Sequence, residues 1–170
     1  IAAQMFRGLE MKNEEGLCLT RVGKALLEAG IKNKLPALLT RGEEAVEQAI
    51  ILFREAGNRK EAGYAHLRIG KAYVDLGIIH GDAQLILRGI AKEEEGARLF
   101  QCDGRLERDL IFARYHIGRN YIEAWRILKA SDLLDKGIRD LRIAAGWFGS
   151  NNEDIMRQKC VGIIERATAA

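Results

Sequence analysis

The feature that most constrains the fold is an internal repeat with a spacing of 47 to 48 residues. Gly23, Gly70 and Gly118 each follow a β-branched residue, and the text around them reads RVGKALLEAG, RIGKAYVDLG and HIGRNYIEAW. A weaker copy, CVGIIERATA, surrounds Gly162. Self-similarity at a fixed spacing is the sequence signature of stacked structural units. We therefore expect the same helix to occur four times.

A second series runs out of phase with the first and predicts a second helix in each unit. Small residues are followed four positions later by an aromatic residue, in the pairs Ala49 and Phe53, Gly96 and Phe100, and Ala144 and Phe148. Residues four apart share one helix face, so the small residue lets a neighbouring helix approach beside a large anchor. Ala2 and Phe6 continue the series one period earlier, so we expect the chain to open inside a second helix.

Composition makes these elements helical, because Pro36 is the single proline and Ala, Leu, Glu, Lys and Arg are abundant. The predicted first helices span 13–30, 59–78, 106–126 and 152–168, and the predicted second helices span 36–56, 81–102 and 130–148. Glycines at 30, 57, 77 and 104 are predicted to end helices, and Asn58 and Asp103 to cap them. Short loops make successive helices antiparallel neighbours.

The two series together resemble the tetratricopeptide repeat. The matching pattern is an apolar and a small residue on the first helix, a large residue three positions on, and a small residue with Phe on the second. The residues are Ile69, Gly70, Tyr73, Gly96 and Phe100 in one copy, Ile117, Gly118, Tyr121, Ala144 and Phe148 in the next, and Leu26, Ala49, Phe53 and Ala56 in the first. The longer period and the missing loop proline make this a long-helix variant, similar in style to arrays that adjoin ATPase modules in bacterial regulators.

The resemblance implies an all-α fold, a right-handed superhelical array of antiparallel helix hairpins (an α-α solenoid). We expect one domain over 1–170, made of a half-helix at 1–11, repeats at about 13–57, 58–104 and 105–150, and a final helix at 151–170. Repeat arrays normally carry polar capping helices. None is evident, so we expect a slice of a longer chain whose truncated ends could self-associate.

In the tetratricopeptide family, the positions two before and one after the small first-helix residue face a concave groove. In this chain they are Arg21 and Lys24, Arg68 and Lys71, and His116 and Arg119. Stacked helices would then present a basic ladder that suits an anionic ligand, such as an acidic peptide or a terminal carboxylate. Asn120 lies beside this set, and Tyr64 and Phe112 add aromatic side chains of the kind that interfaces use beside Arg.

The alternative is that the ladder is a solvated helix surface. Each ladder pair has an acid four residues after its second cation, namely Lys24 with Glu28, Lys71 with Asp75, and Arg119 with Glu123. Exposed pairs of this kind contribute little to stability. The acidic run KEEEG at 92–96 is likewise predicted to be a solvated face of a second helix.

Motifs for catalysis and cofactor binding are missing from the sequence: it has no GxxxxGK[ST] loop, GxSxG elbow, GxGxxG turn or HExxH pair. We therefore expect no enzyme activity, no catalytic or metal-binding residues and no cofactor. A net charge of +3 without a continuous basic stripe argues against nucleic acid as the partner. No apolar stretch is long enough for a membrane helix. Cys18, Cys102 and Cys160 are predicted to be small buried hydrophobes in a reducing compartment, which favours the cytoplasm.

Taken together, these patterns predict a protein–protein interaction scaffold that binds a partner segment in its concave groove. The alternative is a sensor or regulatory arm of a larger signalling ATPase or transcription regulator. In that role, the array would bind a small effector or pack against its own catalytic module.

Overall fold

The computed structural model describes the backbone of residues 2–169 and the side chains of residues 7–169. Every regular element in this part of the chain is a helix, and none is a strand. Its elements are α1 (Ala2–Asn33), α2 (Pro36–Glu55), α3 (Arg59–His80), α4 (Ala83–Gln101), the short 3₁₀ helix η1 (Gly104–Leu106), α5 (Glu107–Leu128), α6 (Ser131–Ser150) and α7 (Asp154–Thr168). The prediction of an all-α fold is therefore confirmed.

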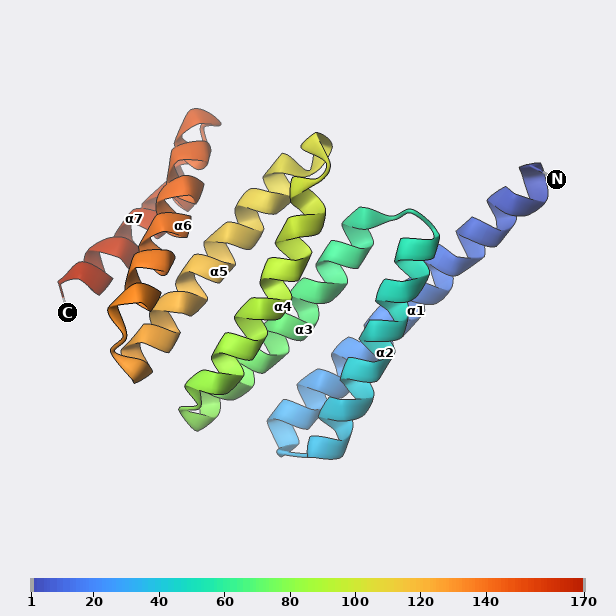
Figure 1. Cartoon of the computed structure of the whole chain (residues 1–170), viewed down its shortest axis with the longest axis horizontal. Helices are drawn as coiled ribbons and strands as arrows, with labels where there is room; N and C mark the ends of the chain where they lie inside the picture. The colour runs from blue at the N-terminus through green and yellow to red at the C-terminus, as the bar shows by residue number, and fades with distance from the viewer. Residues whose placement is uncertain (1, 170) are drawn as a thin grey trace.

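The helices pack mainly as pairs, α1 with α2, α3 with α4, and α5 with α6, and α7 packs against α6. Contacts of α2 with α3 and of α4 with α5 join the pairs. Figure 1 shows the pairs side by side in chain order, with the two ends of the chain far apart. Because α1 also contacts α3, α3 contacts α5, and α5 contacts α7, the odd-numbered helices form a continuous row.

Most predicted helix boundaries agree with the observed ones to within two residues. The predicted cap at Asn58 is present, because its side-chain oxygen accepts a hydrogen bond from the Glu61 amide at 3.2 Å. The predicted helix ends at Gly30 and Gly77 are wrong, because both glycines lie inside helices and are buried against the partner helix. The α3 helix ends instead at Gly81, whose φ of +64° is a left-handed conformation that glycine adopts readily.

The break predicted between the half-helix at 1–11 and the helix at 13–30 is also wrong, because α1 is continuous. Gly16 has the weakest helix preference near the predicted break, but it is buried against α2. A Cβ atom on Gly16 would lie 2.7 Å from the ring of Phe53. Tertiary packing therefore decides the local structure here, because the close contact with α2 stabilises a continuous helix although glycine has a low helix propensity.

The predicted aromatic anchors of the second helices form the core. Phe53, Phe100 and Phe148 are at most 1 % exposed, and each belongs to a separate apolar cluster between adjacent helices. The earlier pair in that series, Ala2 with Phe6, lies outside the residues whose side chains the structure describes. Anchors at this spacing hold each second helix against its partner.

Each helix pair crosses at two facing glycines: Gly23 with Gly42, Gly70 with Gly89, and Gly118 with Gly137. A Cβ atom on the first glycine of each pair would lie 2.6 to 2.9 Å from the carbonyl oxygen of the second. One residue, four positions after the second glycine, fills the rest of each crossing. These residues are Val46, Glu93 and Leu141. The three pairs therefore share one crossing geometry.

The cysteine prediction holds for one of the three residues. Cys160 is buried in the cluster that α7 forms with α5 and α6. Cys18 and Cys102 are exposed, because Cys18 lies on an outward face of α1 and Cys102 follows the last residue of α4. No helix among the described residues combines the length and the apolar character needed to cross a bilayer.

Candidate functional site

The strongest candidate site is a cavity of about 640 Å³ between α3 and α5, with α4 at its base. A cavity of this size is in the range of small-molecule pockets and also accommodates several side chains of a bound peptide. Seven of the nine predicted site residues line it, namely Tyr64, Arg68, Lys71, Phe112, His116, Arg119 and Asn120. The structure therefore brings together side chains that are far apart in the sequence.

Helical spacing explains how α3 and α5 present these side chains. Arg68 and Lys71 are three residues apart, as are His116 and Arg119, so each pair lies on one helix face. Gly70 lies between Arg68 and Lys71 in the sequence and faces α4, where it is buried at the helix crossing. Because this tight crossing fixes the orientation of α3, Arg68 and Lys71 lie on the side of the helix that lines the cavity with α5.

Arg21 and Lys24 lie on α1, outside this cavity, and both are exposed. Lys24 pairs with Glu28 at 3.6 Å, as the solvated-surface alternative predicts. The predicted pair of Lys71 and Asp75 also forms, with 2.5 Å between the ammonium nitrogen and the carboxylate. The first rung of the ladder therefore lies outside the cavity, whereas the other two rungs line it.

Two cations of the cavity, Arg68 and Arg119, have no ion-pair partner in the part of the chain that the structure describes. The pair predicted between Arg119 and Glu123 does not form. Glu123 instead accepts from Arg126 at 2.7 Å, one position nearer in the sequence. The cavity therefore carries two guanidinium groups that form no ion pair with a described carboxylate.

The two aromatic side chains of the cavity are anchored in the core. The Tyr64 ring packs edge-on against Phe100 with 5.3 Å between centroids, and Phe112 packs in the same way against Phe148 at 5.2 Å. The Tyr64 hydroxyl donates to Asp109, and burial together with that hydrogen bond raises the pKa of Tyr64 to about 12. Both rings therefore fill space between helices and also present a rigid apolar wall to the cavity.

Two polar side chains at the base of the cavity, each only 3 % exposed, form what we call the polar floor: Glu93 of α4 and Asn120 of α5. Asn120 Nδ2 donates to Glu93 Oε2 at 2.7 Å, whereas Asn120 Oδ1 has no hydrogen-bond partner among the described residues. Burial raises the pKa of Glu93 to about 7, although Asn120, Arg119 and Lys71 favour the ionised carboxylate. The polar floor can therefore form hydrogen bonds with a ligand near neutral pH.

His116 contributes a neutral hydrogen-bonding group rather than a charge. Its side chain is exposed at the wall of the cavity, but desolvation by the protein atoms around the ring lowers its pKa. The nearby cations Arg119 and Lys71 lower the pKa further. Because the ordinary pKa of histidine is about 6.5, His116 is neutral at pH 7.

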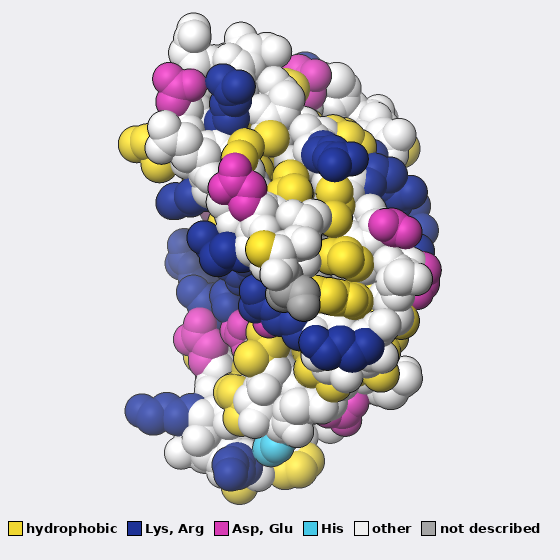
Figure 2. All heavy atoms as spheres, turned by 90° about the vertical axis from the view of Figure 1, so that its left-hand side faces the viewer, with side chains coloured by type: hydrophobic (Ala, Val, Ile, Leu, Met, Phe, Trp, Pro, Cys, Tyr) yellow, Lys and Arg dark blue, Asp and Glu magenta, His cyan; other side chains and the backbone are white. Residues whose placement is uncertain are grey.

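The positive surface continues toward α7. A neighbouring cavity of about 580 Å³ between α5 and α7 shares Arg119 with the first cavity and adds Arg126, Lys159 and Arg166. Figure 2, which views the molecule from the α7 end, shows Lys and Arg side chains gathered along its left side. A ligand that followed the row of odd-numbered helices would meet basic side chains in both cavities.

The prediction that the KEEEG run is a solvated face is wrong for Glu93, which is buried. The sequence did contain a signal. Val46 lies 47 positions earlier and Leu141 lies 48 positions later, so Glu93 occupies a repeat position that is otherwise apolar. Alignment of the second-helix glycines at 42, 89 and 137 would have revealed this departure.

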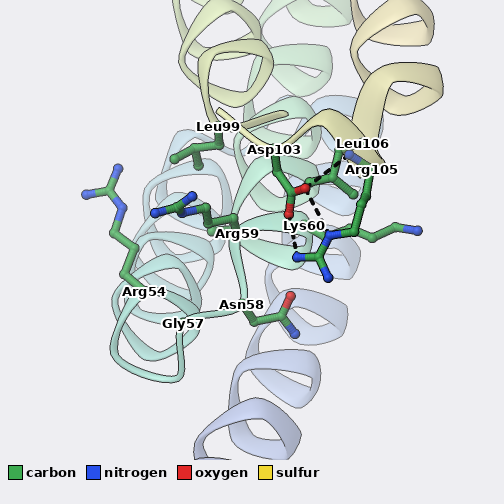
Figure 3. Close-up of a pocket in the computed structure, with 10 residues that line it drawn as sticks. Arg54, Gly57, Asn58, Arg59, Lys60, Leu99, Asp103, Arg105 and Leu106 are labelled. Carbon is green, nitrogen blue, oxygen red and sulfur yellow. Dashed lines mark hydrogen bonds and ion pairs between the residues drawn. The ribbon is translucent and has the colours of Figure 1, made fainter. Parts of the chain in front are cut away.

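A larger cavity of about 820 Å³ lies where α2, α3, α4 and η1 meet (Figure 3). Arg54, Arg59 and Lys60 line it and are exposed, while Arg105 lies against Asp103 with 2.9 Å between Nη2 and Oδ2. None of its lining residues, all of which the structure describes, has a buried side-chain atom in need of a hydrogen-bond partner. It is therefore the weaker candidate.

Comparison with models of protein families, with curated proteins and with solved structures finds no match for the chain. Within the described residues, no group of three or more His, Cys, Asp or Glu side chains is placed to hold a metal ion. Function is therefore inferred from the chemistry of the cavity between α3 and α5.

Proposed function

We propose that the chain is a tetratricopeptide-like scaffold, a right-handed superhelical array of hairpins that binds an acidic segment of a partner protein. The segment would lie along α3, α5 and α7, whose side chains line the two neighbouring basic cavities. The shared glycine crossing supports stacked, equivalent hairpins, and the contacts between successive odd-numbered helices support a continuous binding face.

The observation that carries the proposal is that two cations without an ion-pair partner among the described residues lie beside anchored aromatic rings in one cavity. Carboxylates of the partner would pair with Arg68 and Arg119, whose planar guanidinium groups suit bidentate contacts. Apolar side chains of the partner would pack against Tyr64 and Phe112, which lose little entropy on binding because they already pack on the core. The cavity therefore combines charge complementarity with an apolar anchor.

The test measures binding of fluorescently labelled acidic peptides, with neutral peptides of the same length as controls, by fluorescence anisotropy. The wild-type chain should bind the acidic peptides, and added salt should weaken binding because exposed charges are screened. The variant Arg68→Glu/Arg119→Glu should bind at least about tenfold more weakly, since two favourable contacts become repulsive. Circular dichroism verifies that it is folded.

The variant Arg21→Glu/Lys24→Glu is the matched control, because it makes the same change in charge on α1, outside the cavity. It should retain most of the affinity. An equal loss in both variants would mean that net charge, rather than this cavity, is responsible for binding, and the proposal would be wrong.

A second candidate function is a sensor or regulatory arm of a larger signalling ATPase or transcription regulator that binds a small effector. The volume of the cavity and its buried polar floor favour this reading. A panel of small organic anions tested by thermal unfolding discriminates the two. An effector would raise the Tm of the wild-type chain but not that of Arg68→Glu/Arg119→Glu.

A further inference from the structure

The three helix crossings provide an internal control for the role of Glu93. Val46 and Leu141 fill the equivalent positions in the other pairs, and neither is accessible to solvent. A Cβ atom on Gly70 would lie 2.5 Å from Glu93 Cγ, and one on Gly23 would lie 2.4 Å from Val46 Cγ2. The aliphatic part of Glu93 therefore fills the space that Val46 fills in the first helix pair, and packing at the crossing does not require a carboxylate.

Asn120 is a second departure from the same pattern. The residues two positions after the first-helix glycines are Ala25, Ala72 and Asn120, so alanine occupies this position in the other two pairs. Asn120 reaches from α5 to Glu93 of α4, and the two departures meet in one hydrogen bond at the base of one cavity. Burying polar groups where apolar ones suffice is unfavourable, so packing alone does not account for the pair.

The unpartnered oxygen of Asn120 indicates what a ligand must supply. A buried acceptor without a donor is destabilising, and a ligand N–H or O–H would relieve it once the Asn120 side chain turns its oxygen toward the cavity. A cationic donor is disfavoured, because Arg68 and Arg119 line the same cavity without an ion-pair partner among the described residues. A neutral carboxamide has two N–H groups, which match two acceptors, Asn120 Oδ1 and the Glu93 carboxylate.

We infer that Glu93 and Asn120 are specificity-determining residues, and that they bind the carboxamide of a Gln or Asn side chain that lies among acidic residues of the partner segment. This inference rests on the proposed function and narrows the partner to acidic segments with an amide anchor. The carboxamide enters the cavity between the aromatic walls, while the flanking carboxylates pair with Arg68 and Arg119 at the rim. Selectivity for the anchor comes from the polar floor, and general affinity comes from the rim.

The experiment uses labelled acidic peptides in which one position, varied along the peptide, carries Gln, Met or Lys. Met has about the size of Gln but no donor. The wild-type chain should bind the best Gln peptide about tenfold more tightly than its Met and Lys counterparts, because the Met peptide leaves the polar floor unpaired. The variants Glu93→Val and Asn120→Ala install the residues of the other helix pairs. They should lose this preference and still bind acidic peptides.

The outcomes separate this inference from the proposed function. Equal affinity of the wild-type chain for Gln and Met peptides would refute the amide anchor and leave the proposed binding of acidic segments intact. Loss of binding in Arg68→Glu/Arg119→Glu tests the groove itself. If the wild-type chain binds no acidic peptide, both proposals are wrong.

Thermal unfolding of Glu93→Val/Asn120→Ala tests the role of the polar floor without any ligand. A floor built for recognition predicts a Tm at or above that of the wild-type chain, because the crossing regains the apolar filler that the other pairs use. A clearly lower Tm would show that Glu93 and Asn120 are a structural pair and would overturn the inference.

Discussion

Gly70 of α3 and Gly89 of α4 lie in reciprocal backbone contact. A Cβ atom on Gly70 would lie 2.6 Å from the carbonyl oxygen of Gly89, and a Cβ atom on Gly89 would lie 2.5 Å from that of Gly70. This contact sets the separation of the two helices and, with it, the depth at which Glu93 lies below the cavity. The site therefore depends on a glycine pair that does not touch the ligand.

We expect Gly70→Ala to destabilise the chain by about 1–3 kcal/mol, because the added methyl group overlaps backbone that cannot move without separating the helices. Gly146→Ala is the control, since Gly146 is exposed within α6 and has no atom near its Cβ position. It should stabilise the chain by about 0.5–1 kcal/mol through helix propensity. Urea denaturation measures both, and a Gly70→Ala variant as stable as Gly146→Ala would contradict the tight crossing.

Much of the fold could be predicted because packing and periodicity agree at these crossings. The spacing of Gly23, Gly70 and Gly118 marks every first helix of a complete pair, and the structure places each one at a crossing. Helix ends were less predictable. The sequence suggests that Gly30 ends a helix, but Gly30 lies within α1, and its lack of a side chain lets Leu39 of α2 pack closely against it. Glycine occurs both at helix ends and at close contacts between helices, and only the tertiary contact distinguishes the two roles.

The raised pKa of Glu93 predicts a stability that falls as pH rises. The folded state holds the Glu93 proton more tightly than the unfolded state does, so this contribution is fully present below about pH 4.5 and is lost as pH approaches about 7. The loss is on the order of 3 kcal/mol. In Glu93→Gln, which keeps an acceptor for Asn120, the loss should disappear. Urea denaturation of both proteins between these pH values measures the difference.

Two histidines act in the opposite direction and make the comparison necessary. Burial lowers the pKa of His66 and of His116, so each contributes stability that is lost as pH falls below about 6.5. Both are present in the wild-type chain and in Glu93→Gln, so the difference between the two proteins isolates Glu93. Glu44→Gln makes the same substitution at an exposed carboxylate of α2 and controls for the change in net charge. Parallel profiles for wild type and Glu93→Gln would rule out a buried, titrating Glu93.

The candidate site was predictable in residue type but not in pairing. Positions borrowed from the family pattern identified Arg68, Lys71 and Arg119, which the structure brings together. The ion-pair partner of each cation could not be predicted in this way, because Glu123 lies within reach of both Arg119 and Arg126 along one helix. Spacing alone does not choose between them. The structure pairs Glu123 with Arg126 and leaves Arg119 facing the cavity.

Tyrosine ionisation provides a third prediction. Three hydroxyl groups donate to carboxylates, those of Tyr64 to Asp109, Tyr73 to Glu43 and Tyr121 to Glu94. Burial and these hydrogen bonds raise the pKa of all three tyrosines, that of Tyr64 to about 12. At about pH 11, above the ordinary pKa of tyrosine, the folded chain should show much less phenolate absorbance than the chain in concentrated urea. Equal absorbance in the two states would contradict the three hydrogen bonds.

Thiol reactivity tests the packing of α7. Cys160 is fully buried, and burial raises its pKa to about 11, so little reactive thiolate is present. Cys18 and Cys102 are exposed. An aromatic disulfide reagent that releases a coloured thiolate should therefore consume two thiols quickly at neutral pH and the third only as the chain opens. The variant Cys18→Ser/Cys102→Ser should lose the whole fast phase, and urea should accelerate the slow one. A fast phase of three thiols without denaturant would mean that α7 is not docked against α5 and α6.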